Sequence, residues 1–327
     1  MQSSASIGVR EIKLIQYNKN KGMIIGLLNK LLFAVLFTCS HLVMAHGDGK
    51  LSDPDHPDIR IVMSGAFVSE SGIGVYDEIA NYLGKKLNHQ VSFVSGFSYS
   101  TINAMLDSGT ADIGFVCGLP YVLKRDQTEP MIDVLLAPVS KAPQYKNKPI
   151  YYSYLIVNKD SKAESFADLR GMTFVYNDEI SNSGYNMPRA HLMEQGETRG
   201  FFGQVIRSGS HEESIRMVAN GLADISAVDS LVYDYDLEKY PEFVQQTRIL
   251  EILGPSATPP IVVSKKLSVE LREKIRDVFS GMNSDPEGRG ILDAALLDRF
   301  EIINDSDYDS VRKMYKQAQD TGYMVIR

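Results

Sequence analysis

The sequence has only two cysteines, Cys39 and Cys117, and it lacks the motifs of the common hydrolases. It contains neither a Gly-x-Ser-x-Gly nucleophile elbow nor a His-Glu-x-x-His metal-binding pattern. We therefore expect no catalytic residues, no metal and no cofactor. A hydrolase with Ser183, His211 and Asp229 as its triad is kept as an alternative interpretation only.

Basic residues are fewer than acidic ones, 34 Lys and Arg against 41 Asp and Glu, and the formal net charge is −7. Removing residues 1–45 would take away five basic residues and one acidic residue and leave a formal charge of −11. Such an acidic chain is a poor binder of nucleic acid or of anionic membrane surfaces. It can still bind a small anion where local N–H donors outweigh the overall field.

Long apolar runs are also scarce, and the one present lies at residues 23–45. Lysines precede its apolar core at residues 31–37, and Val43, Met44 and Ala45 resemble a small-residue cleavage site. We predict a signal peptide over residues 1–45, with residues 1–22 as an N-terminal extension, and export to the periplasm. Lipid attachment at Cys39 is disfavoured, because the preceding Thr38 is larger than the residue usual there. Cleavage after Ala45 leaves Cys117 alone, which excludes an intrachain disulfide.

Residues 46–58 are rich in Asp and also contain His46 and His56, which superficially resembles a metal site. The composition is more typical of a solvated polar linker between the signal peptide and the first strand. We interpret it as a linker.

From residue 59 onward, strand-like and helix-like patterns alternate. The predicted strands are 59–64, 91–94, 113–116, 173–176, 204–207 and 225–228, and the predicted helices are 75–87, 101–106, 189–195 and 212–219. This alternation predicts an α/β fold with largely parallel sheets.

The two halves of this pattern resemble each other at an offset of 112 residues. The matching pairs are Ser98 and Ser210, Met105 and Met217, Gly109 and Gly221, Ala111 and Ala223, Asp112 and Asp224, and Ile113 and Ile225. Each copy predicts a loop, a helix ended by glycine, and a buried strand. The offset sets Tyr99 opposite His211 and Cys117 opposite Asp229, each just after a strand. Since ligands bind at the carboxyl ends of strands in open α/β sheets, these loops are expected to face one cleft.

Two extended runs, 149–157 and 253–263, are suited to connect the halves. They predict two α/β lobes joined by two crossover strands, with a ligand cleft between them. We expect one lobe to contain residues 59–150 and 255–327, and the other to contain residues 151–254.

The segment 176–189 is the most informative in the chain. It follows a predicted strand, precedes a predicted helix, and includes Ser181, Asn182, Ser183 and Gly184. Hydroxyl, amide and free backbone N–H groups at a helix start suit a tetrahedral oxyanion. An ordinary turn capped by Ser183 is the alternative, and Pro188 indicates a short tight turn before the helix.

Together these segments resemble the periplasmic substrate-binding proteins of phosphonate, phosphite and phosphate-type ABC transporters. The likeness covers nearly all of the chain from about Ile59. It rests on the stretches at 151–161, 166–171, 181–185, 209–212 and 223–224.

The resemblance implies a type II periplasmic binding fold that closes on a phosphorus oxyanion and delivers it to an ABC permease of the inner membrane. The implied ligand-binding residues are Tyr99, Tyr151, Ser181, Asn182, Ser183 and His211, with Asp229 and Tyr121 as weaker candidates. A monomer is expected, and a histidine donor would allow affinity to vary with pH.

Two points remain open at this level. Asn182 stands where the family commonly has threonine, and the returning run offers no carboxylate for an amino group of a ligand, which leaves Asp229 as the candidate. A binding protein that presents the same cleft to a membrane receptor is the alternative to transport.

Overall fold

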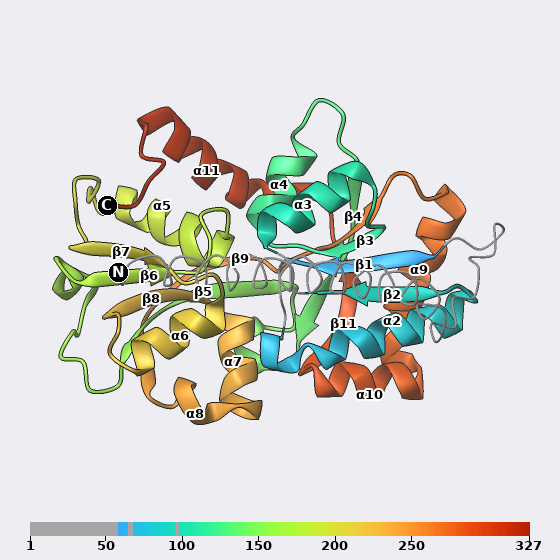
Figure 1. Cartoon of the computed structure of the whole chain (residues 1–327), viewed down its shortest axis with the longest axis horizontal. Helices are drawn as coiled ribbons and strands as arrows, with labels where there is room; N and C mark the ends of the chain where they lie inside the picture. Colours follow the sequence, from blue (N-terminus) through green and yellow to red (C-terminus); the bar gives the residue numbers. More distant parts are fainter. Residues whose placement is uncertain (1–57, 65–67, 96–97) are drawn as a thin grey trace, which may run out of the picture. The chain divides into compact units, whose positions relative to one another are not determined.

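The computed structural model describes residues 58–64, 68–95 and 98–327, so the predicted signal peptide and nearly all of the predicted linker lie outside it. Residues 54–327 form one compact unit built on two sheets (Figure 1). Within the described ranges, no helix has the length and apolar character needed to span a bilayer.

The first sheet has six strands in the order β11-β4-β10-β3-β1-β2. Its strands are β1 (Ile59–Met63), β2 (Val91–Val94), β3 (Ile113–Phe115), β4 (Ile132–Ser140), β10 (Ile261–Ser264) and β11 (Leu297–Ile302). Strands β1, β2 and β3 are parallel, whereas β10 runs antiparallel to β3. One face is covered by α2 (Gly74–Leu87), α9 (Val269–Gly281) and α10 (Pro286–Ala294), and the other by α3 (Tyr99–Ser108) and α4 (Gly118–Arg125). We call this assembly the six-stranded region.

The second sheet has five strands in the order β7-β6-β8-β5-β9. Its strands are β5 (Ile150–Asn158), β6 (Thr173–Tyr176), β7 (Gln204–Arg207), β8 (Ile225–Asp229) and β9 (Thr247–Ala257). Helix α5 (Met187–Glu194) covers one face, and α6 (His211–Ala219), α7 (Ser230–Lys239) and α8 (Pro241–Val244) lie together on the other (Figure 1). We call this assembly the five-stranded region.

Alternation along β5 explains why both faces of this sheet are covered. Leu155 and Val157 are buried in the cluster on the α5 face, and Tyr154 and Ile156 in the cluster on the α6 face. Successive side chains of a strand point to opposite faces, so a continuous apolar run requires layers on both sides.

The repeat predicted from the sequence has equivalent local structure in both copies. Ser98 and Ser210 cap α3 and α6 with their hydroxyls. Gly109 and Gly221 follow those helices with φ of 65° and 69°, which favours glycine. The carboxylates of Asp112 and Asp224 accept the backbone N–H of Arg60 (2.9 Å) and Thr173 (2.8 Å) at equivalent edges of the two sheets. The two regions therefore share the same local arrangement of a serine cap, a glycine after the helix and an aspartate that accepts a strand N–H.

The chain passes between the regions from β4 to β5 and from β9 to β10. It also crosses a third time, through α11 (Asp309–Thr321), which contacts α4 and α5 (Figure 1). Beyond α11, Tyr323 and Ile326 are buried in the core of the five-stranded region, and the Ile326 N–H donates to the Tyr185 hydroxyl at 3.0 Å. The sequence analysis considered two crossover strands and did not anticipate this third connection.

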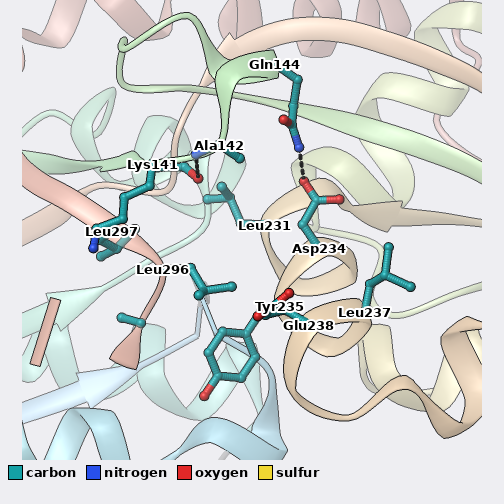
Figure 2. A pocket seen from close by; sticks show the side chains of 12 residues that line it. Lys141, Ala142, Gln144, Leu231, Asp234, Tyr235, Leu237, Glu238, Leu296 and Leu297 are labelled. Carbon is teal, nitrogen blue, oxygen red and sulfur yellow. Dashed lines mark hydrogen bonds between the residues drawn. The ribbon is translucent and has the colours of Figure 1, made fainter. Parts of the chain in front are cut away.

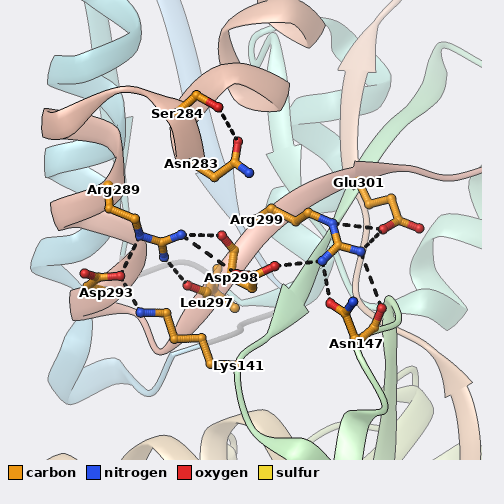
Figure 3. A network of polar contacts seen from close by, with 10 residues as sticks. All are labelled: Lys141, Asn147, Asn283, Ser284, Arg289, Asp293, Leu297, Asp298, Arg299 and Glu301. Atoms are coloured by element: carbon orange, nitrogen blue, oxygen red, sulfur yellow. Dashed lines mark hydrogen bonds and ion pairs between the residues drawn. The ribbon is translucent and has the colours of Figure 1, made fainter.

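A polar network fastens the outer edge of the six-stranded region (Figure 3). Arg289 of α10 donates to the carbonyls of Leu297 and Asp298, and Arg299 of β11 donates to Asn147. These groups are at least partly exposed, so each contact contributes little to stability. The contacts of Arg289 join α10 to β11.

Candidate functional site

The candidate residues lie where strands end and helices begin. Tyr99 is the first residue of α3, Cys117 caps α4, His211 is the first residue of α6 and Asp229 caps α7. The first backbone N–H groups of a helix have no intrahelical acceptor and carry the positive end of its dipole. Contacts described below bring these helix starts from both regions together.

The turn predicted at residues 181–186 is a single π-helical turn, η5 (Asn182–Asn186), which runs directly into α5. The Ser181 hydroxyl accepts the Gly184 N–H at 3.0 Å, and the Ser181 carbonyl accepts the Asn186 N–H at 3.0 Å. The helix therefore begins before Pro188 rather than after it, because proline is tolerated in a first turn. The cap is Ser181, not Ser183.

Gly184 is required by close packing inside this turn. A Cβ atom at Gly184 would lie 1.9 Å from the Asn177 Oδ1 and 3.1 Å from the Ser181 Oγ. The Asn177 amide in turn donates to the Tyr99 hydroxyl at 3.2 Å, across the two regions. The glycine thus leaves room for the side chain of Asn177, which directly follows β6, to pack against the turn and reach the opposite region.

We expect the Gly184→Ala variant to be less stable than the parent by about 1–3 kcal/mol, the usual effect of overpacking a tight site. Thermal unfolding measures the change. Gly281→Ala is the matched control, because a Cβ there meets no atom within 4 Å. Equal melting temperatures for Gly184→Ala and the parent would show that the turn does not need the glycine.

Asn182 connects the two regions. Its amide donates to the Tyr151 hydroxyl at 2.9 Å and to the Ser256 hydroxyl at 3.2 Å, and its Oδ1 accepts from Asn186 at 3.1 Å. Its backbone N–H donates to the Cys117 sulfur at 3.2 Å. The three side-chain partners all belong to the five-stranded region, so Asn182 joins the two regions through its backbone N–H and Cys117.

His211 lies between Ser183 and Asp229. Its Nε2 is 3.5 Å from the Ser183 hydroxyl, and its Nδ1 accepts the backbone N–H of Asp229 at 3.4 Å. Because Nδ1 is the acceptor, the proton of the neutral ring is on Nε2. Burial lowers the pKa of His211 to about 3, so the ring is neutral throughout the physiological range. The expectation that His211 makes affinity vary with pH is therefore wrong for this arrangement. The ring remains a donor.

Asp229 is 3 % exposed and accepts the Leu231 N–H at 2.8 Å. Burial raises the pKa of Asp229 to about 8, although the backbone donors of Leu231 and Val232 oppose the increase. At neutral pH the group is mostly an uncharged acid, which can donate a hydrogen bond. It therefore does not repel an anion as an aspartate usually does.

Tyr151 and Tyr99 complete the cluster. Burial holds the pKa of both phenols well above the usual range, and Cys117 and Asp229 contribute further to the increase. Both tyrosines keep their protons and can donate. Tyr151 is fully buried on β5, and Tyr99 approaches from the six-stranded region.

Tyr121 is not joined to this cluster. Its hydroxyl donates to the Asp305 carboxylate at 2.5 Å, and its ring lies 4.7 Å from the ring of Tyr308. The sequence placed it one turn after Cys117, but the helix directs it toward the 3-10 turn η7 (Asp305–Tyr308) that precedes α11. The structure instead brings in Asn177, Cys117 and Ser256, which the sequence analysis did not select as site residues. Of these three residues, only Cys117 could have been found from the sequence, because the repeat sets it opposite Asp229.

A cavity of about 190 Å³ adjoins the cluster and is lined by Tyr99, Asn177 and His211. That is the space of roughly six water molecules in the liquid. The buried hydroxyls of Ser64 and Ser69 also line it, and neither has a hydrogen-bond partner in the described part of the chain. The cavity suits a small polar ligand.

A larger cavity of about 350 Å³, shown in Figure 2, contains none of the predicted residues. It is lined by Leu231, Leu296 and Leu297 among others, and its Asp234 accepts from Gln144 at 2.8 Å and from Tyr145 at 2.5 Å.

Comparison with known proteins agrees with the family resemblance found in the sequence. The family model described as the periplasmic substrate-binding protein of phosphonate ABC transporters matches residues 69–308. Over 178 residues the chain is 27% identical to the phosphonates-binding periplasmic protein of Escherichia coli (strain K12), covering 52% of each chain. Over 199 residues it is 27% identical to the probable ABC transporter phosphite binding protein PhnD1 of Prochlorococcus marinus (strain MIT 9301), covering 58% of this chain and 65% of that one. The matches thus span about half to two thirds of these relatives.

Two solved structures share the fold. One is a binding protein component of an ABC phosphonate transporter from Pseudomonas aeruginosa, with a TM-score of 0.73, 22% identity, and coverage of 82% of this chain and 89% of that one. The other is PhnD1 from Prochlorococcus marinus in complex with methylphosphonate, with a TM-score of 0.71, 19% identity, and coverage of 80% and 98%. They confirm the predicted type II α/β fold.

Proposed function

Because this chain belongs to the family of periplasmic substrate-binding proteins of phosphonate ABC transporters, we propose that it captures a small phosphorus oxyanion at the cluster around Ser183 and His211 and delivers it to an ABC permease. The ligand class comprises phosphonates, phosphite and phosphate. The relatives it resembles carry phosphonate and phosphite in their names, and one similar structure holds methylphosphonate.

The observation that carries this proposal is the neutral His211 beside Ser183 at the start of a helix. Its Nε2–H and the Ser183 hydroxyl are donors without a formal charge, and Ser183 belongs to the turn η5 that leads into α5. The protonated Asp229 and the two tyrosines add further donors. A phosphoryl group has enough acceptor oxygens to use such a set, and the helix dipoles favour its charge.

The same geometry argues for binding rather than catalysis. In a Ser-His-Asp triad the carboxylate accepts from Nδ1, and Nε2 accepts the serine proton. Here Nδ1 is an acceptor of the Asp229 backbone N–H, so Nε2 already carries a proton and cannot remove one from Ser183. We propose that the protein has no hydrolase activity.

A panel of anions tests the proposed function directly. The mature protein is titrated calorimetrically with phosphate, phosphite, methylphosphonate and ethylphosphonate, and with sulfate as a tetrahedral anion without phosphorus. We expect saturable binding of at least one phosphorus anion, together with a raised melting temperature. Absence of binding by all four, or sulfate binding as tightly as the best of them, would reject the proposal.

We further propose that two lobes close on the ligand about β5 and β9. Their bounds are those predicted, 59–150 with 255–327 and 151–254, except that the residues after α11 belong with 151–254, because Tyr323 and Ile326 are buried there. Opening must break the bonds that join the regions, such as the Asn177 amide to the Tyr99 hydroxyl and the Asn182 backbone N–H to the Cys117 sulfur. Small-angle scattering of the monomeric protein is expected to show a smaller radius of gyration with ligand than without it. An unchanged radius, with binding verified on the same sample, would contradict lobe closure.

Members of this family are periplasmic, and we propose that this chain reaches the periplasm through a signal peptide cleaved after Ala45. The mature protein is then expected to begin at His46 and to need no detergent. N-terminal sequencing of periplasmic material decides the question. A start at Cys39 with an attached lipid would replace this prediction.

A further inference from the structure

A second hollow of about 660 Å³ lies where the two regions meet, between the short helix η2 (Glu70–Gly72) and helices α6, α7 and α8. In Figure 1 these three helices form one group on a single side of the five-stranded sheet. The Ser71 N–H donates to the Glu212 carboxylate at 2.9 Å across the boundary. The hollow is therefore bounded by both regions.

The wall of this hollow is strongly acidic. It carries one guanidinium, that of Arg216, and five carboxyl groups, those of Glu70, Glu212, Glu213, Asp236 and Glu242. Arg216 is already engaged by Glu213, at 2.7 Å between Nε and Oε2. Within the described ranges, no salt bridge joins the other four carboxyl groups to a cation.

Besides the acidic wall, the buried carboxyl group of Asp236 is a second, independent observation that points to a ligand in this hollow. Its residue is 5 % exposed, it lines the hollow, and its Oδ1 has no hydrogen-bond partner among the described residues. The neighbouring Ser69 hydroxyl is also buried without one. A buried, unsatisfied carboxylate oxygen is costly, so its retention points to a group that binds there.

The rest of the wall indicates which kind of cation fits. Ile215, Tyr240, Phe243 and Val244 provide an apolar and aromatic side. No group of three or more acidic, histidine or cysteine side chains in the described part of the chain is arranged to hold a metal ion. Carboxylates opposite aromatic and aliphatic surface suit an alkylammonium, whose charge meets the acids while its carbon chain meets the apolar side.

We propose that this hollow is a binding site for a small organic cation, an alkylammonium, held by Asp236 and Glu212. Because Glu70 and Ser71 come from one region and Glu212 and Asp236 from the other, the cation would favour the joined arrangement. If the proposed anion function holds, the two ligands are linked, and each raises the affinity for the other by the same factor.

The pKa values of the carboxyl groups in the hollow agree with the proposed cation site. Burial raises the pKa of Asp236 to about 7, and the charge of Glu212 adds to the increase. Burial also raises the pKa of Glu70, with Glu212 and Glu213 contributing. A bound cation favours the ionised carboxylates, so its affinity is expected to rise as the pH increases through about 7.

The test is calorimetric titration of the mature protein, without any anion ligand, with 1,4-diaminobutane at constant ionic strength. We expect saturable binding to the parent and at least tenfold weaker binding to Asp236→Asn. Glu238→Gln is the matched control on the same helix, since Glu238 lines the cavity of Figure 2 instead, and its affinity should equal that of the parent. Neutral 1,4-butanediol should not bind.

The proposal is overturned if the parent does not bind the diamine, if Asp236→Asn binds it like the parent, or if the diol binds equally well. Circular dichroism and thermal unfolding establish that Asp236→Asn is folded. Since no anion is present, failure of the anion panel leaves this test unaffected. Where an anion does bind, adding the diamine should raise its affinity in the parent but not in Asp236→Asn.

Discussion

The Ser183→Ala and His211→Ala variants are each expected to bind the preferred phosphorus anion far more weakly than the parent. Each of the two side chains offers a donor, and the Ser183 Oγ and the His211 Nε2 are 3.5 Å apart. Loss of one donor to a charged ligand group typically costs about 1.5–3 kcal/mol, or roughly ten- to a hundredfold in affinity. Calorimetric titration with the best anion of the panel measures the effect.

Tyr121→Phe is the matched control for these variants, because the Tyr121 hydroxyl is occupied by Asp305. We expect this variant to bind the anion like the parent. Melting temperatures within a few degrees of the parent would show that the alanine variants are folded. If both of them bind with parental affinity, the anion is held elsewhere, and the assignment of the turn at Ser183 is wrong.

The second large effect is the change of stability with pH that follows from the raised pKa of Asp229. An aspartate in an unfolded chain has a pKa of about 4, whereas burial raises the pKa of Asp229 to about 8. Between these values the folded protein binds the proton more tightly, so this group lowers stability progressively as the pH rises from about 4 to 8. Above that range the loss is on the order of several kcal/mol, since each tenfold change in an equilibrium corresponds to about 1.4 kcal/mol.

Asp229→Asn removes this ionisation and keeps a side-chain oxygen that can accept the Leu231 N–H as a helix cap. We therefore expect the variant to match the parent in stability near pH 5 and to exceed it at pH 9. Urea unfolding at both pH values measures the difference. Asp160→Asn, at an exposed position, is the control and should change little. A stability difference that does not grow with pH would show that Asp229 is not held in its acid form.

The contribution of His211 to stability depends on pH in the opposite direction from that of Asp229. Its folded pKa of about 3 lies below the ordinary value of about 6.5. Its contribution to stability is complete above pH 6.5 and is lost as the pH falls toward 3. The two pH windows overlap between about 4 and 6.5, but only that of Asp229 extends above pH 6.5. The rise of stability in Asp229→Asn at pH 9 cannot be produced by His211.

The local signals of the sequence were sufficient for most of the secondary structure of the repeat. Strands 91–94, 173–176 and 204–207 were predicted with the bounds that the structure has. Caps and glycine stops act within a few residues, as do the alternating and helical apolar patterns, so they can be read from the chain directly. The placement of Tyr99, His211 and Asp229 at strand ends followed from the same signals.

Hydrogen-bond partners and protonation could not be predicted in this way. The sequence predicted Asn182 as a ligand-binding residue but not its side-chain partners in the protein, of which Tyr151 and Ser256 are 31 and 74 positions away. The acid form of Asp229 and the neutral form of His211 depend on how completely packing removes water from them. Burial of that kind is a property of the assembled core.

The sequence by itself determined the α/β class, the two similar halves, the helix starts that carry the donors and the likeness to phosphonate-binding proteins, because these depend on short-range patterns and on motifs. Only the tertiary structure decided that Tyr121 turns to Asp305, that the residues after α11 pack into the five-stranded region, and that the carboxyl groups of Glu70, Glu212 and Asp236 line one hollow. Those outcomes join residues more than a hundred positions apart, and long-range packing, not local preference, brings them together.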